Sequence, residues 1–269
     1  MKIRRIAGTF VGLYALLLIG IFSFQRSLLY FPSHSYVTLH DAYATGSFKE
    51  LPVKTADGID LKAWYAPATT KPYTFVFFHG NGDSLASASE IANPYIAAGY
   101  GFLVTEYRGY SGLQGKPTEA GLYADARAYL YALMARGVQS ENIILFGHSL
   151  GTGVVVQMAT EFNVGGVILL APYTSVAKMA QIEYPFIPAE YMVLDRFESA
   201  KKVGDIHVPL LIVNGANDQV IPPSQGRQLF DSANEPKEFH SMPNHGHNDL
   251  FRDFVPLGLA WTDRLQASK

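Results

Sequence analysis

The chain has 269 residues, 48% of them hydrophobic, and a formal net charge of −2. This length and apolar content suffice for one large α/β domain or two small ones, and the near-neutral charge gives no indication of a nucleic-acid partner. The absence of cysteine excludes disulfides, thiolate catalysis, cysteine-ligated metals and lipoprotein acylation.

An uncharged run of nineteen residues, Ile6 to Phe24, is the first predicted element. As a helix it would be roughly 28 Å long, close to the ~30 Å hydrocarbon core of a bilayer. Lys2, Arg4 and Arg5 precede it, so the positive-inside rule keeps the N-terminus in the cytoplasm and exports the rest. We therefore expect a single-pass membrane anchor over residues 1–26, with the following domain outside the cytoplasm.

The alternative for this segment is a cleaved signal peptide, which would make the mature protein secreted. Signal peptides usually have a shorter apolar region that is followed by a cleavage site with small residues. No such site follows Phe24, because the next residues are Gln25, Arg26 and Ser27. The sequence therefore favours the anchor and keeps the signal peptide as the alternative.

The rest of the chain divides into a linker over residues 27–47 and a folded domain over residues 48–269. Two strand-like runs flank Asp57-Gly58, which is a hairpin signal. Short apolar strands and helical patterns then alternate: we predict strands at 75–78, 101–105, 143–146, 164–170, 210–213 and 237–242, and helices at 87–98, 118–136, 154–158, 224–232 and 248–265. This alternation predicts an α/β fold with a mostly parallel sheet, helices on both faces and an antiparallel edge. Residues 172–205 interrupt it, and we expect a small helical cap there.

The pentapeptide Gly147-His148-Ser149-Leu150-Gly151 lies between a predicted strand and a predicted helix. A strand, a G-x-S-x-G turn and a helix together form a nucleophile elbow, which raises the serine oxygen above the sheet. The glycines are needed because the turn is too tight for side chains beside the serine. By chance the pattern arises in roughly one of eight sequences of this composition, so Ser149 also needs catalytic partners elsewhere.

A nucleophilic serine needs a histidine as base and an acid that orients the histidine. In folds with an elbow, the acid comes after the serine and before the histidine. Asp218 fits because it follows the apolar strand at 210–213 by a short polar turn. Asp195, Asp205 and Asp231 also lie in this interval, but none directly follows an apolar strand.

Three histidines follow the predicted acid. His247 lies just before the final helix, whose positive end favours the neutral imidazole of a general base. His245 is the second choice, and His240 falls within a strand. Two histidines this close also suggest a metal site, but no third ligand lies at a recognisable spacing, so we expect neither a metal nor a cofactor.

The tetrahedral intermediate of acyl transfer needs backbone amides that stabilise its oxyanion. One is the amide after the nucleophile, at Leu150, and the other comes from the loop that follows an earlier strand. That loop is His79-Gly80-Asn81-Gly82, in which we choose Asn81, with Gly82 close behind. Each donor is typically worth roughly 3 kcal/mol of transition-state stabilisation. We expect His79 and His148 to orient loops rather than to transfer protons.

With these residues assembled, the chain resembles the α/β-hydrolase superfamily. More narrowly, it resembles membrane-anchored serine hydrolases of the bud-emergence and serine aminopeptidase-like type. The matching stretches are Phe78 to Gly82, Glu106 to Tyr110, Gly115 to Glu119, Gly147 to Gly151, Ala171 to Ser175 and Gly246 to Asp249. The resemblance covers about residues 48 to 265 and implies an eight-stranded sheet, Asp218 as the triad acid and His247 as the triad histidine.

Two positions depart from the pattern of the family. Glu106 stands where relatives usually carry Asp, and Ser111 stands where a glycine commonly follows Gly-Tyr. Neither is a triad position, so they affect the expected shape of a loop near the pocket and leave the expected chemistry unchanged.

These residues predict a membrane-anchored serine hydrolase that cleaves an ester or thioester through an acyl-enzyme, with an amide as a further option. Its substrate would be a small or acylated molecule, and apolar residues in the expected cap suggest an apolar acyl group. Some members of the family remove palmitoyl groups from proteins, and others are peptidases. The alternatives are a non-catalytic, membrane-bound binding protein with this fold, and lyase or haloperoxidase chemistry on the same triad. Oligomeric state is not predicted.

Overall fold

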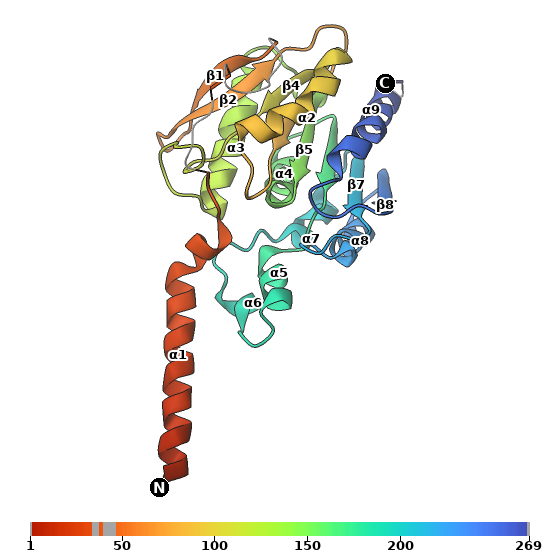
Figure 1. The fold of residues 1–269 in the computed structure, drawn as a ribbon. Helices are drawn as coiled ribbons and strands as arrows, with labels where there is room; N and C mark the ends of the chain where they lie inside the picture. The colour runs from red at the N-terminus through yellow and green to blue at the C-terminus, as the bar shows by residue number, and fades with distance from the viewer. Residues whose placement is uncertain (1, 34–37, 40–46, 268–269) are drawn as a thin grey trace.

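Eight strands form one sheet in the computed structural model, which describes residues 2–33, 38–39 and 47–267 (Figure 1). Their order across the sheet is β1-β2-β4-β3-β5-β6-β7-β8. The strands are β1 (Lys49–Lys54), β2 (Asp60–Ala66), β3 (Thr74–Phe78), β4 (Gly101–Val104), β5 (Ile143–His148), β6 (Gly166–Leu170), β7 (Leu210–Gly215) and β8 (Lys237–Met242). β2 pairs antiparallel with both β1 and β4, and the other pairings are parallel. The prediction of a mostly parallel sheet with an antiparallel edge is confirmed.

Helices connect the strands and cover both faces of the sheet. Those that pack on it are α2 (Leu85–Ala97), α3 (Glu119–Met134), α4 (Leu150–Glu161), α8 (Pro223–Ser232) and α9 (Phe251–Ala267). The final helix was predicted from residue 248 but begins at Phe251. The Asp249 carboxylate accepts a 2.7 Å hydrogen bond from the Gly246 amide, which holds these residues in a turn ahead of the helix.

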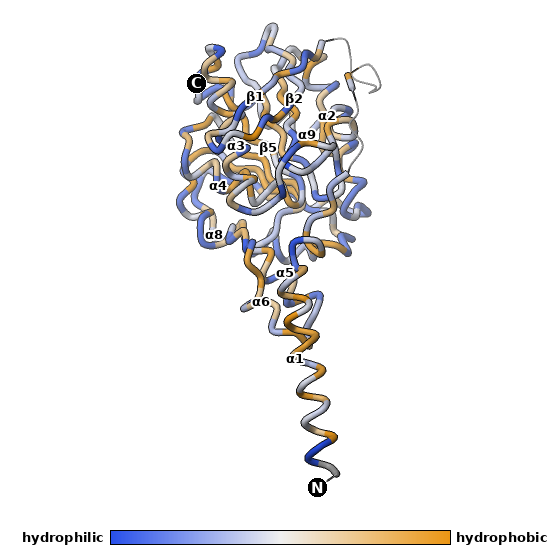
Figure 2. Tube along the Cα trace, turned by 90° about the vertical axis from the view of Figure 1, so that its left-hand side faces the viewer, coloured by the Kyte–Doolittle hydropathy of each residue, from blue (hydrophilic) through white to orange (hydrophobic). Residues whose placement is uncertain are grey.

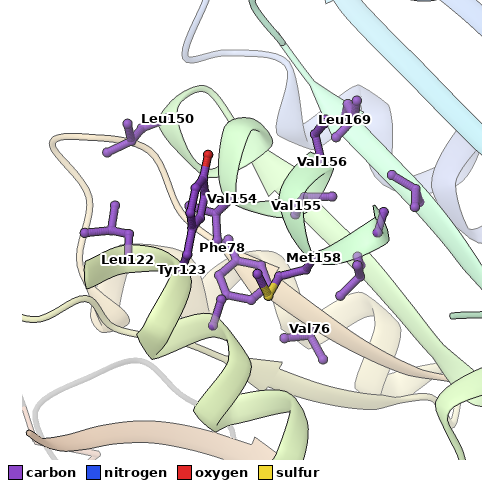
Figure 3. Close-up of a cluster of buried hydrophobic side chains, with 14 of the residues drawn as sticks. Val76, Phe78, Leu122, Tyr123, Leu150, Val154, Val155, Val156, Met158 and Leu169 are labelled. Atoms are coloured by element: carbon purple, nitrogen blue, oxygen red, sulfur yellow. The ribbon is translucent and has the colours of Figure 1, made fainter. Parts of the chain in front are cut away.

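Alternate residues of β3 show why its sequence is apolar from Phe75 to Phe78. Val76 and Phe78 join the apolar core on one face, which α3 and α4 cover and which Figure 3 shows in part. Phe75 and Phe77 join the core on the other face, which α2 and α9 cover. A strand that is buried on both faces carries mostly apolar side chains on both. The sheet is therefore fixed from both sides, and its carboxyl edge is left to carry polar groups.

α1 (Lys2–Leu29) projects from the domain as one long helix (Figures 1 and 2). Its part from Arg4 to Leu29 is long and apolar enough to cross a membrane, and none of the most apolar window is buried within the protein. A single-pass anchor and a signal sequence both meet this description. The helix continues past residue 26, the predicted end of the anchor. Of the predicted linker over residues 27–47, positions 34–37 and 40–46 lie outside the described residues, as do positions 268–269 of the predicted domain.

Three short helices occupy the region where we predicted a cap, between β6 and β7. They are α5 (Val176–Glu183), α6 (Ala189–Met192) and α7 (Ser199–Lys202). α5 and α6 lie beside α1 in both views of the molecule (Figures 1 and 2). An ion pair joins α1 to the cap region: Arg26 Nε donates to Asp195 Oδ2 at 2.8 Å. The cap region and α1 therefore meet at the carboxyl edge of the sheet.

Candidate active site

Ser149 lies between the end of β5 and the start of α4, with φ 50° and ψ −117°. A positive φ is unfavourable for a residue with a side chain, so the surrounding structure must hold it. One contact that stabilises this conformation is the hydrogen bond from the Ser149 amide to the Leu170 carbonyl oxygen of the neighbouring β6, at 3.0 Å. The predicted elbow geometry is present at this serine.

The two glycines of the elbow allow close approach of backbone to backbone. A Cβ at Gly147 would lie 2.7 Å from the Gly151 carbonyl oxygen, and a Cβ at Gly151 would collide with the Phe78 carbonyl oxygen at the end of β3. Any larger residue at Gly151 would therefore push α4 away from the loop that follows β3. The glycines thus bring Ser149 and the His79–Gly82 loop together.

The structure brings Ser149, His247 and Asp218 into one chain of hydrogen bonds. Ser149 Oγ lies 2.9 Å from His247 Nε2, and His247 Nδ1 lies 2.8 Å from Asp218 Oδ2. A carboxylate only accepts hydrogen bonds, so Nδ1 carries the proton that is donated to Asp218. Nε2 is then free to accept the proton of the serine hydroxyl, which is the arrangement that a general base requires.

Asp218 is held in place by its own backbone turn. Its other carboxylate oxygen, Oδ1, accepts hydrogen bonds from the amides of Val220 and Ile221, both at 2.8 Å. Burial is the largest influence on the pKa of Asp218 and raises it, but the hydrogen bonds from His247, Ile221 and Val220 outweigh burial, so the pKa is lowered from its usual value. Asp218 is therefore ionised at neutral pH and can stabilise a charged imidazole beside it.

The other candidate acids have different partners or positions. Asp195 pairs with Arg26 of α1, and Asp231 pairs with Arg227 at 3.0 Å within α8. Asp205 ends a short 3₁₀ helix (Val203–Asp205) ahead of β7. Asp218 is the carboxylate that bonds to His247, whose other ring nitrogen reaches Ser149 Oγ.

The structure brings His247 to the serine and gives His245 other partners. His245 Nδ1 lies 2.8 Å from the Pro243 carbonyl oxygen, and its Nε2 lies 2.9 Å from Asp253 Oδ2 in α9. His240 lies within β8, as predicted, near Glu238. Across the described ranges, no group of three or more His, Asp or Glu side chains is placed to hold a metal ion.

The loop that carries His247 packs against the end of β7. A Cβ at Gly215 would lie 2.5 Å from the His245 carbonyl oxygen, so glycine is required for this close approach. His148 Nε2, from the elbow itself, lies 3.2 Å from the His247 carbonyl oxygen. His148 therefore orients the His247 loop, which agrees with the loop-orienting role expected for it.

Asn81 and Leu150 supply the two amides that we expected to face an oxyanion. The Leu150 amide is at the N-terminus of α4, where helical amides have no partner within the helix. In the part of the chain that the structure describes, the backbone amide of neither residue donates to another backbone group. Both amides are therefore available to a ligand.

The side chain of Asn81 has a role that the sequence did not reveal. Its Nδ2 donates to the Leu29 carbonyl oxygen at 2.5 Å, and its Oδ1 accepts from the Phe31 amide at 3.1 Å and the Tyr110 hydroxyl at 2.7 Å. Leu29 ends α1 and lies 52 residues away in sequence, so no local pattern could have indicated the contact. The loop with the candidate oxyanion donor is thus tied to the end of α1.

The two residues that depart from the family pattern are bonded to each other. Ser111 Oγ donates to Glu106 Oε2 at 2.5 Å, and both side chains are buried. Ser111 has φ 48°, a conformation that favours glycine. The hydrogen bond to Glu106 compensates for a serine in that conformation, so the two departures form one compensated pair.

Glu106 also pairs with His79, the first residue of the candidate oxyanion loop. Glu106 Oε1 lies 2.8 Å from His79 Nε2, while His79 Nδ1 lies 2.7 Å from the Gly80 carbonyl oxygen. Both ring nitrogens face acceptors, which fits a charged imidazole. Burial is the largest influence on the pKa of His79 and lowers it, but the charge and hydrogen bond of Glu106 outweigh burial and raise the pKa above 6.5.

A family model described as serine aminopeptidase, S33, matches residues 71–200. The uncharacterized protein Rv2307c of Mycobacterium tuberculosis is 34% identical over 247 residues, covering 89% of this chain and 87% of that protein. The human alpha/beta hydrolase domain-containing protein 17B is 37% identical over 183 residues, covering 66% of this chain and 61% of that protein.

Solved structures with the same fold include two esterases. The Pyrococcus furiosus esterase PF2001 aligns with a TM-score of 0.69 at 15% identity, over 88% of this chain and 97% of that one. An esterase domain from Rhodothermus marinus aligns with a TM-score of 0.63 at 19% identity, over 81% and 98%. The chain belongs to the α/β-hydrolase superfamily, which confirms the resemblance found in its motifs.

The pairing of Glu106 with Ser111 predicts energetic coupling between them. Glu106→Asp should lower the free energy of unfolding by about 2 kcal/mol, because the shorter carboxylate loses a buried hydrogen bond. In a Ser111→Gly background, the same change should cost about 1 kcal/mol less, because its partner hydroxyl is already absent. Urea unfolding of the four proteins measures this double-mutant cycle.

Ser232→Gly on α8 is the matched control, because Ser232 donates to the Gln228 carbonyl and shares no partner with Glu106. The control cycle should be additive within about 0.3 kcal/mol. If the Glu106–Ser111 cycle were equally additive, the two residues would not compensate each other.

The pair of His79 with Glu106 predicts that stability falls at alkaline pH. The folded protein holds a proton on His79 that the unfolded chain releases above its ordinary pKa of 6.5. This stabilisation is complete below that pH and is lost as pH rises through the higher folded-state pKa. Glu106→Gln removes the countercharge and should cost about 3 kcal/mol at acid to neutral pH.

Urea unfolding at about pH 6 and about pH 9 measures this effect. The wild type should lose more stability between the two values than Glu106→Gln. Equal losses in the two proteins would show that His79 is not charged in the folded state.

Proposed function

We propose that the protein is a membrane-anchored serine hydrolase that cleaves an ester or thioester through an acyl-enzyme. The observation that carries this proposal is the chain of hydrogen bonds from Ser149 through His247 to Asp218. These hydrogen bonds join Ser149, whose φ is positive, to His247, whose Nδ1 carries the proton, and to Asp218, which is ionised. Membership of the α/β-hydrolase superfamily supports the hydrolase chemistry.

In the proposed reaction, Ser149 Oγ attacks the carbonyl carbon of the substrate while His247 Nε2 takes the hydroxyl proton. The backbone amides of Asn81 and Leu150 stabilise the oxyanion that forms. His247 then donates its proton to the departing alkoxide or thiolate, which leaves an acyl-serine. A water molecule then attacks the carbonyl carbon of the acyl-serine, with His247 again as base, and the carboxylic acid and the free serine are released.

Asp218 stabilises the imidazolium that forms twice in each cycle. Its charge is retained at neutral pH, since its pKa is lowered by the hydrogen bonds that it accepts. An amide substrate would use the same groups but has a poorer leaving group. We therefore propose ester or thioester cleavage first, with amides as the more demanding option.

The anchor is the second part of the proposal, with the N-terminus in the cytoplasm and the domain exported. Tyr14, within the apolar run of α1, donates from its hydroxyl to the Phe186 carbonyl oxygen in the cap region at 2.8 Å. A signal peptide that is removed has no need of contacts with the mature domain. This contact favours a retained helix over cleavage and secretion.

Covalent labelling with a fluorophosphonate probe tests the proposed nucleophile. The wild type should label, and Ser149→Ala should not, because the probe reacts with an activated serine. His247→Ala should abolish turnover of a p-nitrophenyl ester, and Asp218→Asn should lower kcat by about 10⁴-fold through loss of the correct tautomer. His245→Ala is the matched control and should retain most activity.

A folded wild-type protein that does not label would overturn the enzyme proposal in favour of a non-catalytic binding protein. Loss of activity in His245→Ala with retention in His247→Ala would overturn the assignment of the base. Analysis of the products separates hydrolysis from lyase or haloperoxidase chemistry on the same residues.

A further inference from the structure

Exposed large apolar side chains are concentrated in two places. One is α1 together with Phe31, and the other is a segment of the cap region, residues 182–194, which we call the cap tip. Elsewhere in the described residues, such side chains are found only at Tyr131 and Val220. Soluble proteins rarely leave contiguous apolar surface uncovered, so the cap tip is a candidate contact surface.

The cap tip exposes two of its aromatic side chains almost completely. Phe186 is 89% exposed and Tyr191 is 88% exposed. The exposed apolar side chains of the tip are Ile182, Tyr184, Phe186, Tyr191 and Leu194. No Lys or Arg lies between residues 179 and 195, and Glu183 and Glu190 are the charged residues of the tip. The surface is therefore mostly apolar, and it has no cation that would bind anionic headgroups.

The cap tip follows α1 along much of its length. Besides the Tyr14–Phe186 hydrogen bond, Gln25 Oε1 accepts from the Leu194 amide at 2.7 Å, and Gln25 Nε2 donates to the Met192 carbonyl oxygen at 3.3 Å. From Tyr14 to Gln25 the helix rises by about 17 Å. The cap tip therefore lies beside the same stretch of α1 that a membrane span needs (Figures 1 and 2).

The length of α1 determines which of its residues would lie in the bilayer. The apolar residues before Tyr14, at positions 6–13, would extend only about 12 Å, too short for a hydrocarbon core of ~30 Å. A spanning α1 must therefore use residues 14–24 as well. The cap tip lies beside those residues, so it must enter the bilayer with them.

The backbone of the cap tip is suited to such an environment. Hydrocarbon offers no water, so polar backbone groups need partners within the protein. The Tyr14 hydroxyl satisfies the Phe186 carbonyl, and the Ile187 amide donates to the Tyr184 carbonyl oxygen at 3.1 Å. Pro185 and Pro188 have no amide hydrogen. The exposed turn therefore presents few unsatisfied donors to lipid.

The stems of the cap connect this surface to the elbow. The Tyr173 hydroxyl donates to the Leu150 carbonyl oxygen at 3.1 Å. A Cβ at Gly153, in the first turn of α4, would lie 2.9 Å from the Phe197 ring. On the other side, Asn81 is bonded to Leu29 at the end of α1. The candidate nucleophile thus lies between two segments that lead to the membrane.

We infer that the cap tip is inserted into the bilayer beside α1 and that the enzyme takes membrane-resident acyl substrates. The inference rests on the proposed function, since it assumes that α1 spans the membrane and that Ser149 is the nucleophile. Insertion is driven by apolar burial, so it does not depend on anionic lipid or low salt.

Site-specific probes test the depth of the cap tip, and the chain offers a clean background because it has no cysteine. Phe186→Cys and Tyr191→Cys in the full chain are labelled with an environment-sensitive fluorophore and reconstituted in phosphatidylcholine vesicles. Tyr131→Cys on α3, where the tyrosine is also exposed, is the matched control, and Leu16→Cys reports on α1. Lipids with a nitroxide on the acyl chain serve as quenchers.

Emission from positions 186 and 191 should be blue-shifted and quenched several-fold more strongly than emission from position 131, in pure phosphatidylcholine and at high salt alike. Quenching at 186 and 191 no greater than at 131 would overturn the inference, whether or not position 16 is quenched. Fluorophosphonate labelling of the same samples reports on the nucleophile separately. A shallow cap with intact labelling would leave the proposed hydrolase standing. A deep cap without labelling would refute the hydrolase, and with it the acyl substrates, but not the insertion of the cap tip.

Discussion

The positive φ of Ser149 is the constraint on which the rest of the site depends. The turn at 147–151 can hold this conformation because Gly147 and Gly151 admit backbone contacts that no larger residue would permit. The same contacts draw the start of α4 onto the end of β3, which places the loop with Asn81 beside the serine. The strain at one residue thus organises the candidate nucleophile and the candidate oxyanion donors together.

The carboxyl edge of the parallel sheet explains why distant residues meet at this serine. The parallel strands β5, β7 and β8 all end at this edge. Ser149 follows β5, Asp218 follows β7 and His247 follows β8. Apolar packing on both faces fixes the strands, so the loops that follow them are held by a rigid scaffold. The hydrogen bonds of the proposed triad therefore require little further ordering.

The order and spacing of motifs made much of this site predictable. Ser149 follows a strand in a glycine-rich turn, Asp218 follows a later strand, and His247 precedes the last helix, all of which are local signals. The central strands β3 to β7 were likewise evident as short, largely apolar runs. The start of α9 was missed because the Asp249 carboxylate caps a turn, and that choice depends on the packing of the loop rather than on helical periodicity.

The remaining features depend on residues that are far apart in sequence. Glu106 and Ser111 were each recognisable as unusual, but only their 2.5 Å hydrogen bond shows that one compensates the other. The contacts of Asn81 with Leu29, and of Tyr14 with Phe186, join the N-terminal helix to the loops around the site. No propensity or spacing encodes such pairings, because they arise from the way the whole chain packs. They make α1 part of the surroundings of the candidate active site as well as a candidate anchor.

Detection of the acyl-enzyme tests the central claim most directly. Rapid mixing of the full-length protein with a p-nitrophenyl ester should release a burst of nitrophenolate equal to the enzyme concentration, and peptide mass spectrometry should locate the acyl group on Ser149. Ser149→Ala should show neither the burst nor the adduct. Turnover that persists in Ser149→Ala, or an acyl group on a different residue, would contradict the account.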